Sequence, residues 1–251
     1  MDSPNLAAWR ELWEYRDVWI FSIALVVALP LLGYARFRRF VATRGAMLST
    51  SGKLTLYARI AASQWLLVLA MLLILHRHGL TAADAGQNLH RPGLTVPMTA
   101  GLLATLAILT AVVLRRIHRS KPEDLAGALG KAKVMTPVSW REFAAFAVVC
   151  LTAGICEELL YRGWLVTLLW AVTRSPWVAV AIGAVCFGAG HAYQGIRGMV
   201  RTAIVGLQMG IFLVWTGSLI PGQVLHAGID LMAGLASIAI AARNKVSDSI
   251  I

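Results

Sequence analysis

Seven long runs of apolar residues restrict this chain to one kind of fold. Six of the runs are near the roughly 20 residues that a helix needs to cross the hydrocarbon core at about 1.5 Å per residue, and one is longer. Inside lipid every backbone N–H and C=O must be paired internally, which leaves helices and closed barrels. Barrels show weak alternating segments, whereas these runs are continuous. The sequence therefore predicts an all-α, polytopic transmembrane bundle with spans near 18–35, 55–75, 96–114, 142–170, 177–195, 199–217 and 221–242.

The composition also separates this chain from soluble proteins. Hydrophobic residues make up 58% of its 251 residues and charged residues 14%, whereas soluble domains carry about 25% charged residues. A net charge of +11 could suit nucleic acid. However, the basic residues cluster just beyond apolar runs, as orientation determinants do. We therefore expect contact with a lipid bilayer and none with nucleic acid.

The distribution of basic residues predicts how the chain is threaded. Segments 36–59 and 115–141 carry six and seven Lys or Arg residues, whereas 76–95 carries two. With seven spans, the positive-inside rule places the N-terminus outside and the C-terminus in the cytoplasm. The first 17 residues hold four acidic residues and two arginines, unlike the basic start of a cleavable signal. The small size and lack of a targeting extension indicate the inner (cytoplasmic) membrane of a prokaryote.

The fourth apolar run is too long for one regular span. As a helix, residues 142–170 would extend about 43 Å, against a hydrocarbon core of about 30 Å. We expect a break at Gly154, which would leave 155–170 as a separate helix. The clearest linker is the basic segment 115–141. The predicted organisation is therefore N-terminal helices and linker over 1–141, a catalytic helical core over 142–242, and a tail over 243–251.

The fourth run contains charged residues that are costly in a membrane. Each such group costs about 2.5–3.5 kcal/mol at a helix centre, so it normally faces the bundle interior and serves a function there. Glu158 and Arg162 are four residues apart and can form an ion pair on one helix face. Glu157 is turned about 100° away from Glu158, so that pair does not satisfy it. Glu157 is thus left as an unpaired carboxylate.

Two later runs add further ionisable residues with helical spacing. Phe187 and His191 are four residues apart on the fifth run, and His226 and Asp230 on the last. Each group alone has a structural interpretation: an ion pair, a satisfied core histidine, or a hydrogen bond that locks a helix. Together they indicate a functional site, because a bundle so poor in charge has no other evident reason to collect them.

Hydrolysis is the chemistry that these groups suit. A buried carboxylate beside a neutral imidazole can accept a proton from water as a general base. Polar groups on another helix can donate hydrogen bonds to the developing oxyanion. A glutamate and two histidines (Glu157, His191 and His226) are also a plausible set of ligands for a divalent metal, and their spacing does not decide between the two. The chain contains no His-Glu-x-x-His and no Gly-x-Ser-x-Gly motif.

As a set, these residues resemble the CAAX protease and bacteriocin-processing family of membrane-embedded prenyl endopeptidases and their prokaryotic relatives. That family's pattern is Glu-Glu-x-x-x-Arg, then Phe-x-x-x-His, then His-x-x-x-Asn or Asp. The chain matches it at 157–162, 187–191 and 226–230, and the resemblance covers about 142–242. The resemblance implies a glutamate-type intramembrane endopeptidase. Its substrate would be a membrane-anchored or membrane-proximal protein or peptide.

The resemblance also implies a role for each matched residue. Glu157 and His191 would activate the water, His226 and Asp230 would form the oxyanion pocket, and Glu158, Arg162 and Phe187 would support the site. The family frequently has asparagine where this chain has Asp230, and an ionised aspartate cannot donate to an oxyanion. Either Asp230 is protonated, or it only orients His226. We assign no cofactor and no metal, with zinc as the alternative.

Two other functions compete with the peptidase hypothesis. One is a bacteriocin-immunity or binding protein that keeps the site without catalysis. The other is a proton-coupled transporter, which would normally show repeated halves that this sequence lacks. One geometric problem also arises, because straight spans place Glu157 and His191 about 13 Å apart in depth. We attribute that gap to the span limits rather than to the site.

Overall fold

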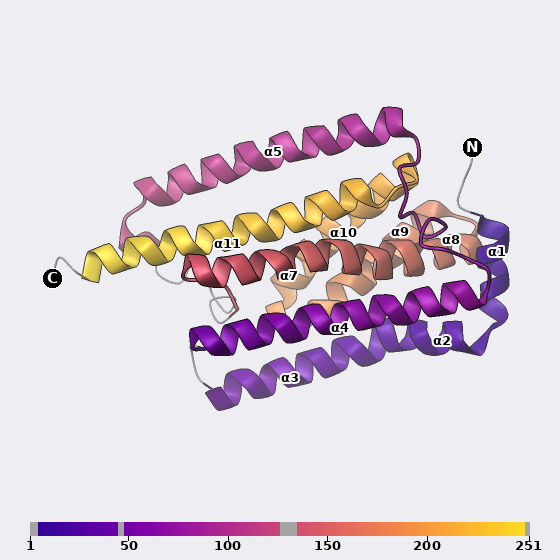
Figure 1. Ribbon diagram of the computed structural model, residues 1–251, viewed down its shortest axis with the longest axis horizontal. Coiled ribbons are helices and arrows are strands. Elements are labelled where there is room, and N and C mark those ends of the chain that lie inside the picture. The colour runs from indigo at the N-terminus through magenta and orange to yellow at the C-terminus, as the bar shows by residue number, and fades with distance from the viewer. Residues whose placement is uncertain (1–4, 45–47, 126–134, 249–251) are drawn as a thin grey trace.

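The computed structural model describes residues 5–44, 48–125 and 135–248, and every regular element among them is helical (Figure 1). The first long segment comprises α2 (Arg16–Ile23), a π-helical stretch η2 (Ala24–Ala28) and α3 (Leu29–Arg44). It is followed by α4 (Thr50–Arg77), α5 (Pro92–Arg119), α7 (Trp140–Glu158), η4 (Leu159–Val166), α8 (Thr167–Thr173), α9 (Pro176–Gly190), α10 (Ile196–Thr216) and α11 (Ile220–Asp248). The short elements are α1 (Leu6–Glu11), η1 (Leu12–Glu14), α6 (Pro122–Leu125) and η5 (Ala192–Gln194).

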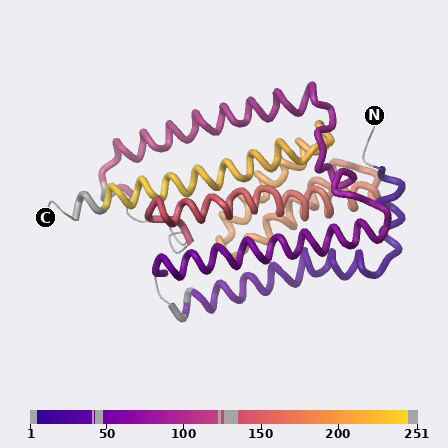
Figure 2. Tube along the Cα trace, in the orientation of Figure 1, coloured from indigo at the N-terminus to yellow at the C-terminus, as the bar shows by residue number. Residues whose placement is uncertain are grey.

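The lengths and apolar character of these helices make the protein an integral, multi-pass membrane protein. Among the described residues, six helical segments are long and apolar enough to cross a membrane, and α9 is a shorter apolar helix of 15 residues. With α9 counted, the structure agrees with the predicted bundle of about seven spans. Figure 2 places α1 at one end of the bundle and the C-terminal end of α11 at the other, as an odd number of passes requires.

The long helices form a layer with a helical hairpin behind it. Helices α5, α11, α7 and α4 lie side by side in that order (Figure 1). Helices α9 and α10 pack against each other and against η4 and α11, on one side of this layer. Helix α3 approaches α9 and η5 and closes the bundle there. The α9–α10 turn is therefore in contact with α3, a helix from the N-terminal part of the chain.

The turn between α9 and α10 lies part-way along the length of the bundle, because α9 is too short to reach its far end. Its 15 residues rise about 22 Å, and His191 is its C-cap. The turn between α8 and α9 is a common reference for depth. Glu157 precedes Thr173, the end of α8, by about 24 Å of helix, and His191 follows Pro176, the start of α9, by about 22 Å. The two residues are therefore level. The expected offset of about 13 Å was wrong, because it treated the fourth segment as ending at the membrane faces, whereas that helix has 34 residues.

The fourth segment departs from regular α-helix at a different place from the one predicted. Helix α7 continues through Gly154, and the hydrogen-bonding pattern becomes π-helical only at Leu159. The glycine serves close packing instead: an added Cβ would lie 2.9 Å from the Cβ of Ala227 and 2.9 Å from the carbonyl oxygen of Gln223. π-Helical stretches frequently occur at functional sites. Here the stretch begins directly after the paired glutamates.

Gly154 is expected to be intolerant of a side chain. Gly154→Ala should lower the free energy of unfolding by about 1–3 kcal/mol, because α7 and α11 must move apart. The matched control is Gly101→Ala on α5, where an added Cβ meets nothing within 4 Å. That change should be neutral or slightly stabilising, since alanine favours the helix. Thermal unfolding in detergent measures both variants, and equal stability of the two would contradict the packing argument.

A buried ion pair joins α4 to α7 at one end of the bundle. Nζ of Lys53 lies 3.0 Å from Oε2 of Glu142, and both side chains are almost fully buried. Glu142 also accepts from Oγ1 of Thr50 at 2.8 Å and from the backbone N of Val138 at 2.9 Å. Sequence analysis did not single out this cluster. It holds α4 along the helix that carries the paired glutamates.

Candidate active site

The three sequence motifs meet at one point inside the bundle. Glu157 comes from the end of α7, His191 from the end of α9 and His226 from α11. Oε2 of Glu157 lies 3.9 Å from Nε2 of His191 and 3.8 Å from Nε2 of His226. All three side chains are at least four-fifths buried. One carboxylate oxygen therefore faces two imidazole rings that come from different helices.

The two oxygens of Glu157 have different surroundings. Oε1 accepts a 2.6 Å hydrogen bond from Nε2 of Gln64 on α4. Oε2 is buried and has no hydrogen-bond partner among the described residues. Sequence analysis missed Gln64, whose only signal was a lone amide inside the second apolar run. Oε2 is thus the oxygen of Glu157 that is not engaged in a hydrogen bond.

Hydrogen bonds on the far side of each ring orient the two histidines. Nδ1 of His191 lies 2.9 Å from the backbone oxygen of Phe187. A carbonyl only accepts, so Nδ1 carries a proton, and in the neutral ring Nε2 presents its lone pair toward Glu157. Nδ1 of His226 lies 3.1 Å from Oε1 of Glu158. Both rings therefore direct Nε2 toward the same carboxylate oxygen.

Glu158 and Arg162 form the predicted ion pair. Nη1 of Arg162 donates to Oε1 of Glu158 at 2.8 Å, and each side chain is 1% exposed. The guanidinium also stacks on the Phe187 ring, with Cζ 4.1 Å from the ring centroid. Two glycines make room for the pair: a Cβ at Gly206 would lie 2.8 Å from Nη2 of Arg162, and one at Gly222 would lie 3.1 Å from Oε2 of Glu158. The pair is packed too tightly to reach substrate.

Asp230 lies at the rim of the site. Its side chain is 39% exposed, and Oδ2 is 3.7 Å from Nε2 of His226, beyond hydrogen-bond distance. The hydrogen bond that His226 does make crosses from α11 to Glu158. A helix-locking hydrogen bond between His226 and Asp230, one of the interpretations of the sequence, is therefore not formed.

A cavity of about 200 Å³ opens beside the glutamate and the histidine of the first two motifs. Helix α4 and the first long segment, α2–η2–α3, supply much of its apolar wall. Its lining residues are Leu25, Leu29, Pro30, Gln64, Leu67, Glu157, Leu160, Tyr161, Gly190, His191 and Tyr193. A reacting molecule held there would lie against the side chains of Glu157 and His191. The N-terminal helices thus contribute to the site even though they carry none of the three motifs.

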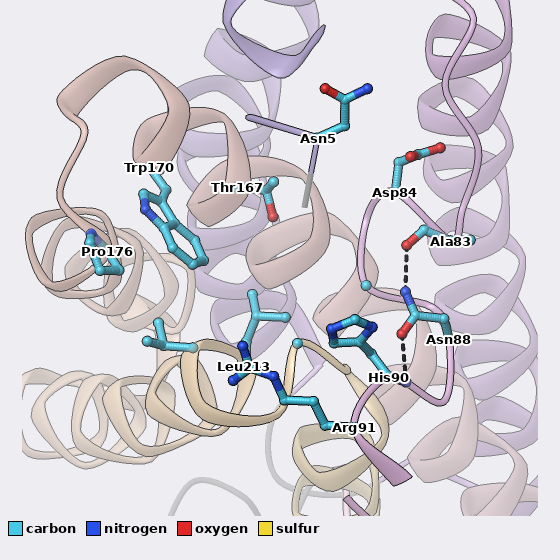
Figure 3. Close-up of a pocket in the computed structure, with 13 residues that line it drawn as sticks. Asn5, Ala83, Asp84, Asn88, His90, Arg91, Thr167, Trp170, Pro176 and Leu213 are labelled. Atoms are coloured by element: carbon cyan, nitrogen blue, oxygen red, sulfur yellow. Dashed lines mark hydrogen bonds between the residues drawn. The ribbon is translucent and has the colours of Figure 1, made fainter. Parts of the chain in front are cut away.

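A second, larger cavity of about 460 Å³ lies at the end of the bundle where α8 turns into α9 (Figure 3). Its polar side chains are mainly engaged in holding the loop between α4 and α5. Asp84 accepts from the backbone N of Thr81, and Asn88 bonds to the backbone oxygen of Ala83 and the backbone N of His90. The 200 Å³ cavity is therefore the better candidate for chemistry.

Glu157, His191 and His226 are the residues that would hold a metal in the alternative to a metal-free site. Within the described part of the chain, no three His, Cys, Asp or Glu side chains are grouped as ligands of one ion. The Nδ1 atoms of His191 and His226 are each occupied, by Phe187 and by Glu158. Both Nε2 atoms remain free, so zinc on Glu157, His191 and His226 stays the alternative to a metal-free site.

The helical membrane bundle encloses a carboxylate–imidazole cluster. The family model described as "Type II CAAX prenyl endopeptidase Rce1-like" matches residues 139–232, which include all three motifs. Segment 139–232 is therefore a domain of this peptidase family, as the resemblance indicated. Residues 1–138 lie outside the match. No curated protein and no solved structure matches the chain.

Proposed function

We propose that the protein is an intramembrane endopeptidase that hydrolyses a peptide bond in a membrane-anchored or membrane-proximal protein or peptide. The observation that carries this proposal is the position of Oε2 of Glu157. This oxygen is buried and unpaired, it faces Nε2 of His191 and of His226, and its side chain lines a cavity. Oε2 of Glu158 is also unpaired, but Glu158 is bonded to Arg162 and His226 and does not line this cavity.

In the first step, water attacks the carbonyl carbon of the scissile bond. Oε2 of Glu157 accepts one proton of the water as the new C–O bond forms, which is general-base catalysis. Nε2 of His191 accepts the second hydrogen bond of the water and so aligns it. The electron pair of the C=O bond moves to its oxygen. The proton on Glu157 then passes to the leaving nitrogen as the C–N bond breaks, which restores the carboxylate.

His226 is the proposed donor to the oxyanion. Two buried carboxylates, Glu157 and Glu158, stand against one guanidinium, Arg162, so an imidazolium at His226 balances the charge. Its Nδ1–H then donates to Glu158, and its Nε2–H is free to donate to the developing oxyanion. Asp230 lies 3.7 Å from Nε2 of this ring, and its carboxyl adds a second donor when it carries a proton.

The proposed orientation places the end of the bundle opposite α1 in the cytoplasm. The C-terminal ends of α3 and α5 lie there, and they carry Arg36, Arg38, Arg115, Arg116 and Arg119 (Figure 1). The N-terminus then lies outside, in the inner membrane of a prokaryote. His191 lies about 22 Å from Pro176, the start of α9. The substrate segment must therefore reach into the hydrocarbon core.

Cleavage of a reporter in vesicles tests this function. The purified protein is mixed with single-span membrane reporters, and mass spectrometry reads the new termini. His191→Ala should slow cleavage about 10²- to 10⁴-fold, because the water loses one of its two acceptors. The control is His118→Ala on the exposed end of α5, which should cleave at the wild-type rate.

Host protection by a double variant distinguishes the peptidase from the immunity or binding protein. A protein that protects its host without catalysis would keep that protection when Glu157→Gln and His191→Ala are combined. Such protection, together with no cleavage by the wild type, would overturn the peptidase proposal.

A further inference from the structure

We infer that Gln64 is a positioning residue for Glu157, and that the working site therefore extends beyond segment 139–232 to α4. This inference rests on the proposed function and adds a residue that neither the three motifs nor the family match includes. Gln64 and Glu157 are 93 residues apart in the chain.

The contact between the two residues is short, and the direction of its hydrogen bond is determined by the two groups. Nε2 of Gln64 lies 2.6 Å from Oε1 of Glu157. The reverse orientation of the amide would set its oxygen against a carboxylate oxygen, and neither of these atoms can donate. Gln64 therefore donates. It is also the one hydrogen-bond donor that Glu157 has among the described residues.

This single donor determines which way the carboxylate points. The last torsion of a glutamate side chain has a broad, roughly two-fold profile, so a free carboxylate rotates easily. Holding Oε1 on α4 leaves Oε2 directed toward His191 and His226. Glu158 needs no such help, because it is already bonded to Arg162 and His226. Without Gln64, the carboxylate of Glu157 would no longer be held in one orientation relative to the two histidines.

The surrounding packing makes α4 a stable platform for this donor. Lys53, on the same helix, is held by the buried carboxylate of Glu142 on α7. The two helices that carry Gln64 and Glu157 are thus connected at a second point by a polar contact. A functional group needs support of this kind to stay within about 0.5 Å of its working geometry.

Replacing Gln64 tests the inference directly. Gln64→Leu should lower kcat about 10- to 100-fold and leave KM within about threefold, since a misplacement of about 1 Å can cost 100-fold in rate. The matched control is Gln87→Leu, which removes a glutamine hydrogen bond of the same 2.6 Å length, to Gln223. Gln87 does not line the 200 Å³ cavity, so this variant should keep kcat within about twofold. Equal kcat in the two variants would overturn the inference.

A charge-changing variant gives a readout that a purely structural role would not move. In Gln64→Glu the introduced carboxyl can still donate to Glu157 while the two groups share one proton. Two adjacent carboxylates cannot easily both be ionised, and the pair titrates as a unit. Activity should therefore be retained at low pH and fall at high pH, when the shared proton is lost. A pH profile identical to that of the wild type would count against donation by Gln64.

Infrared spectroscopy examines the contact without relying on cleavage. The carboxyl band that disappears in Glu157→Gln should shift in Gln64→Leu and stay in place in Gln87→Leu. An unshifted band would overturn the inference, whatever the rates are. A shifted band in a protein that cleaves no reporter would instead leave the contact standing and remove the proposed function.

Discussion

Glu157→Gln is expected to reduce peptide hydrolysis at least about 10³-fold while the protein stays folded. The amide has nearly the size and shape of the carboxylate, and its oxygen can still accept from Gln64. It cannot take a proton from water, however, so general-base catalysis is lost. The measurement is the initial rate of reporter cleavage in vesicles, with thermal unfolding as the check of fold.

The control for this variant is Glu14→Gln, an exposed glutamate in η1 near the N-terminal end of the first long segment. It should leave the rate unchanged. Cleavage by Glu157→Gln at a rate near that of the wild type would contradict the mechanism, because no other described carboxylate contacts both Nε2 atoms.

Arg162→Leu is expected to have the largest effect on stability. Removing one partner of a buried ion pair typically costs about 3–5 kcal/mol, because the other charge is left without compensation. Here Glu158 would keep only His226 as a partner. The Phe187 ring would also lose the guanidinium stacked on it. Unfolding in detergent, by heat or by denaturant, should show the loss.

Two further variants show whether charge is the cause. Arg201→Leu removes an exposed arginine on α10 and should change stability by less than about 0.5 kcal/mol. The double variant Glu158→Leu with Arg162→Leu removes both charges. It should recover much of the loss, since replacing a whole buried pair with apolar residues is often neutral. A single Arg162→Leu variant as stable as the wild type would refute the structural role.

Local spacing predicted part of the site correctly because it depends on one helix at a time. Glu158 and Arg162 are four residues apart, and the ion pair between them is formed. Phe187 and His191 have the same spacing, and the ring of His191 is held by the backbone oxygen of Phe187. The same spacing brings Oδ2 of Asp230 to 3.7 Å from Nε2 of His226, but the hydrogen bond of that ring goes from Nδ1 to Glu158 on another helix.

The interruption of the fourth segment shows a different limit. Glycine weakens a helix, and so Gly154 was the expected break. In the structure the helix continues through it, since α11 packs so close that no side chain would fit. The helix continues through a glycine when the free energy gained by close packing exceeds the free energy lost through the low helix propensity of glycine. The π-helical stretch that begins at Leu159 had no marker in the sequence.

From the sequence alone follow the membrane bundle, the order of its spans and the residues of the three motifs, because hydrophobic length and helical period act within single segments. The tertiary structure alone decided that Glu157 is level with His191, that Gln64 holds one of its oxygens, and that Lys53 and Glu142 join their two helices. These contacts join residues far apart in the chain. They depend on how far each helix extends and how closely its neighbours approach, which no local pattern records.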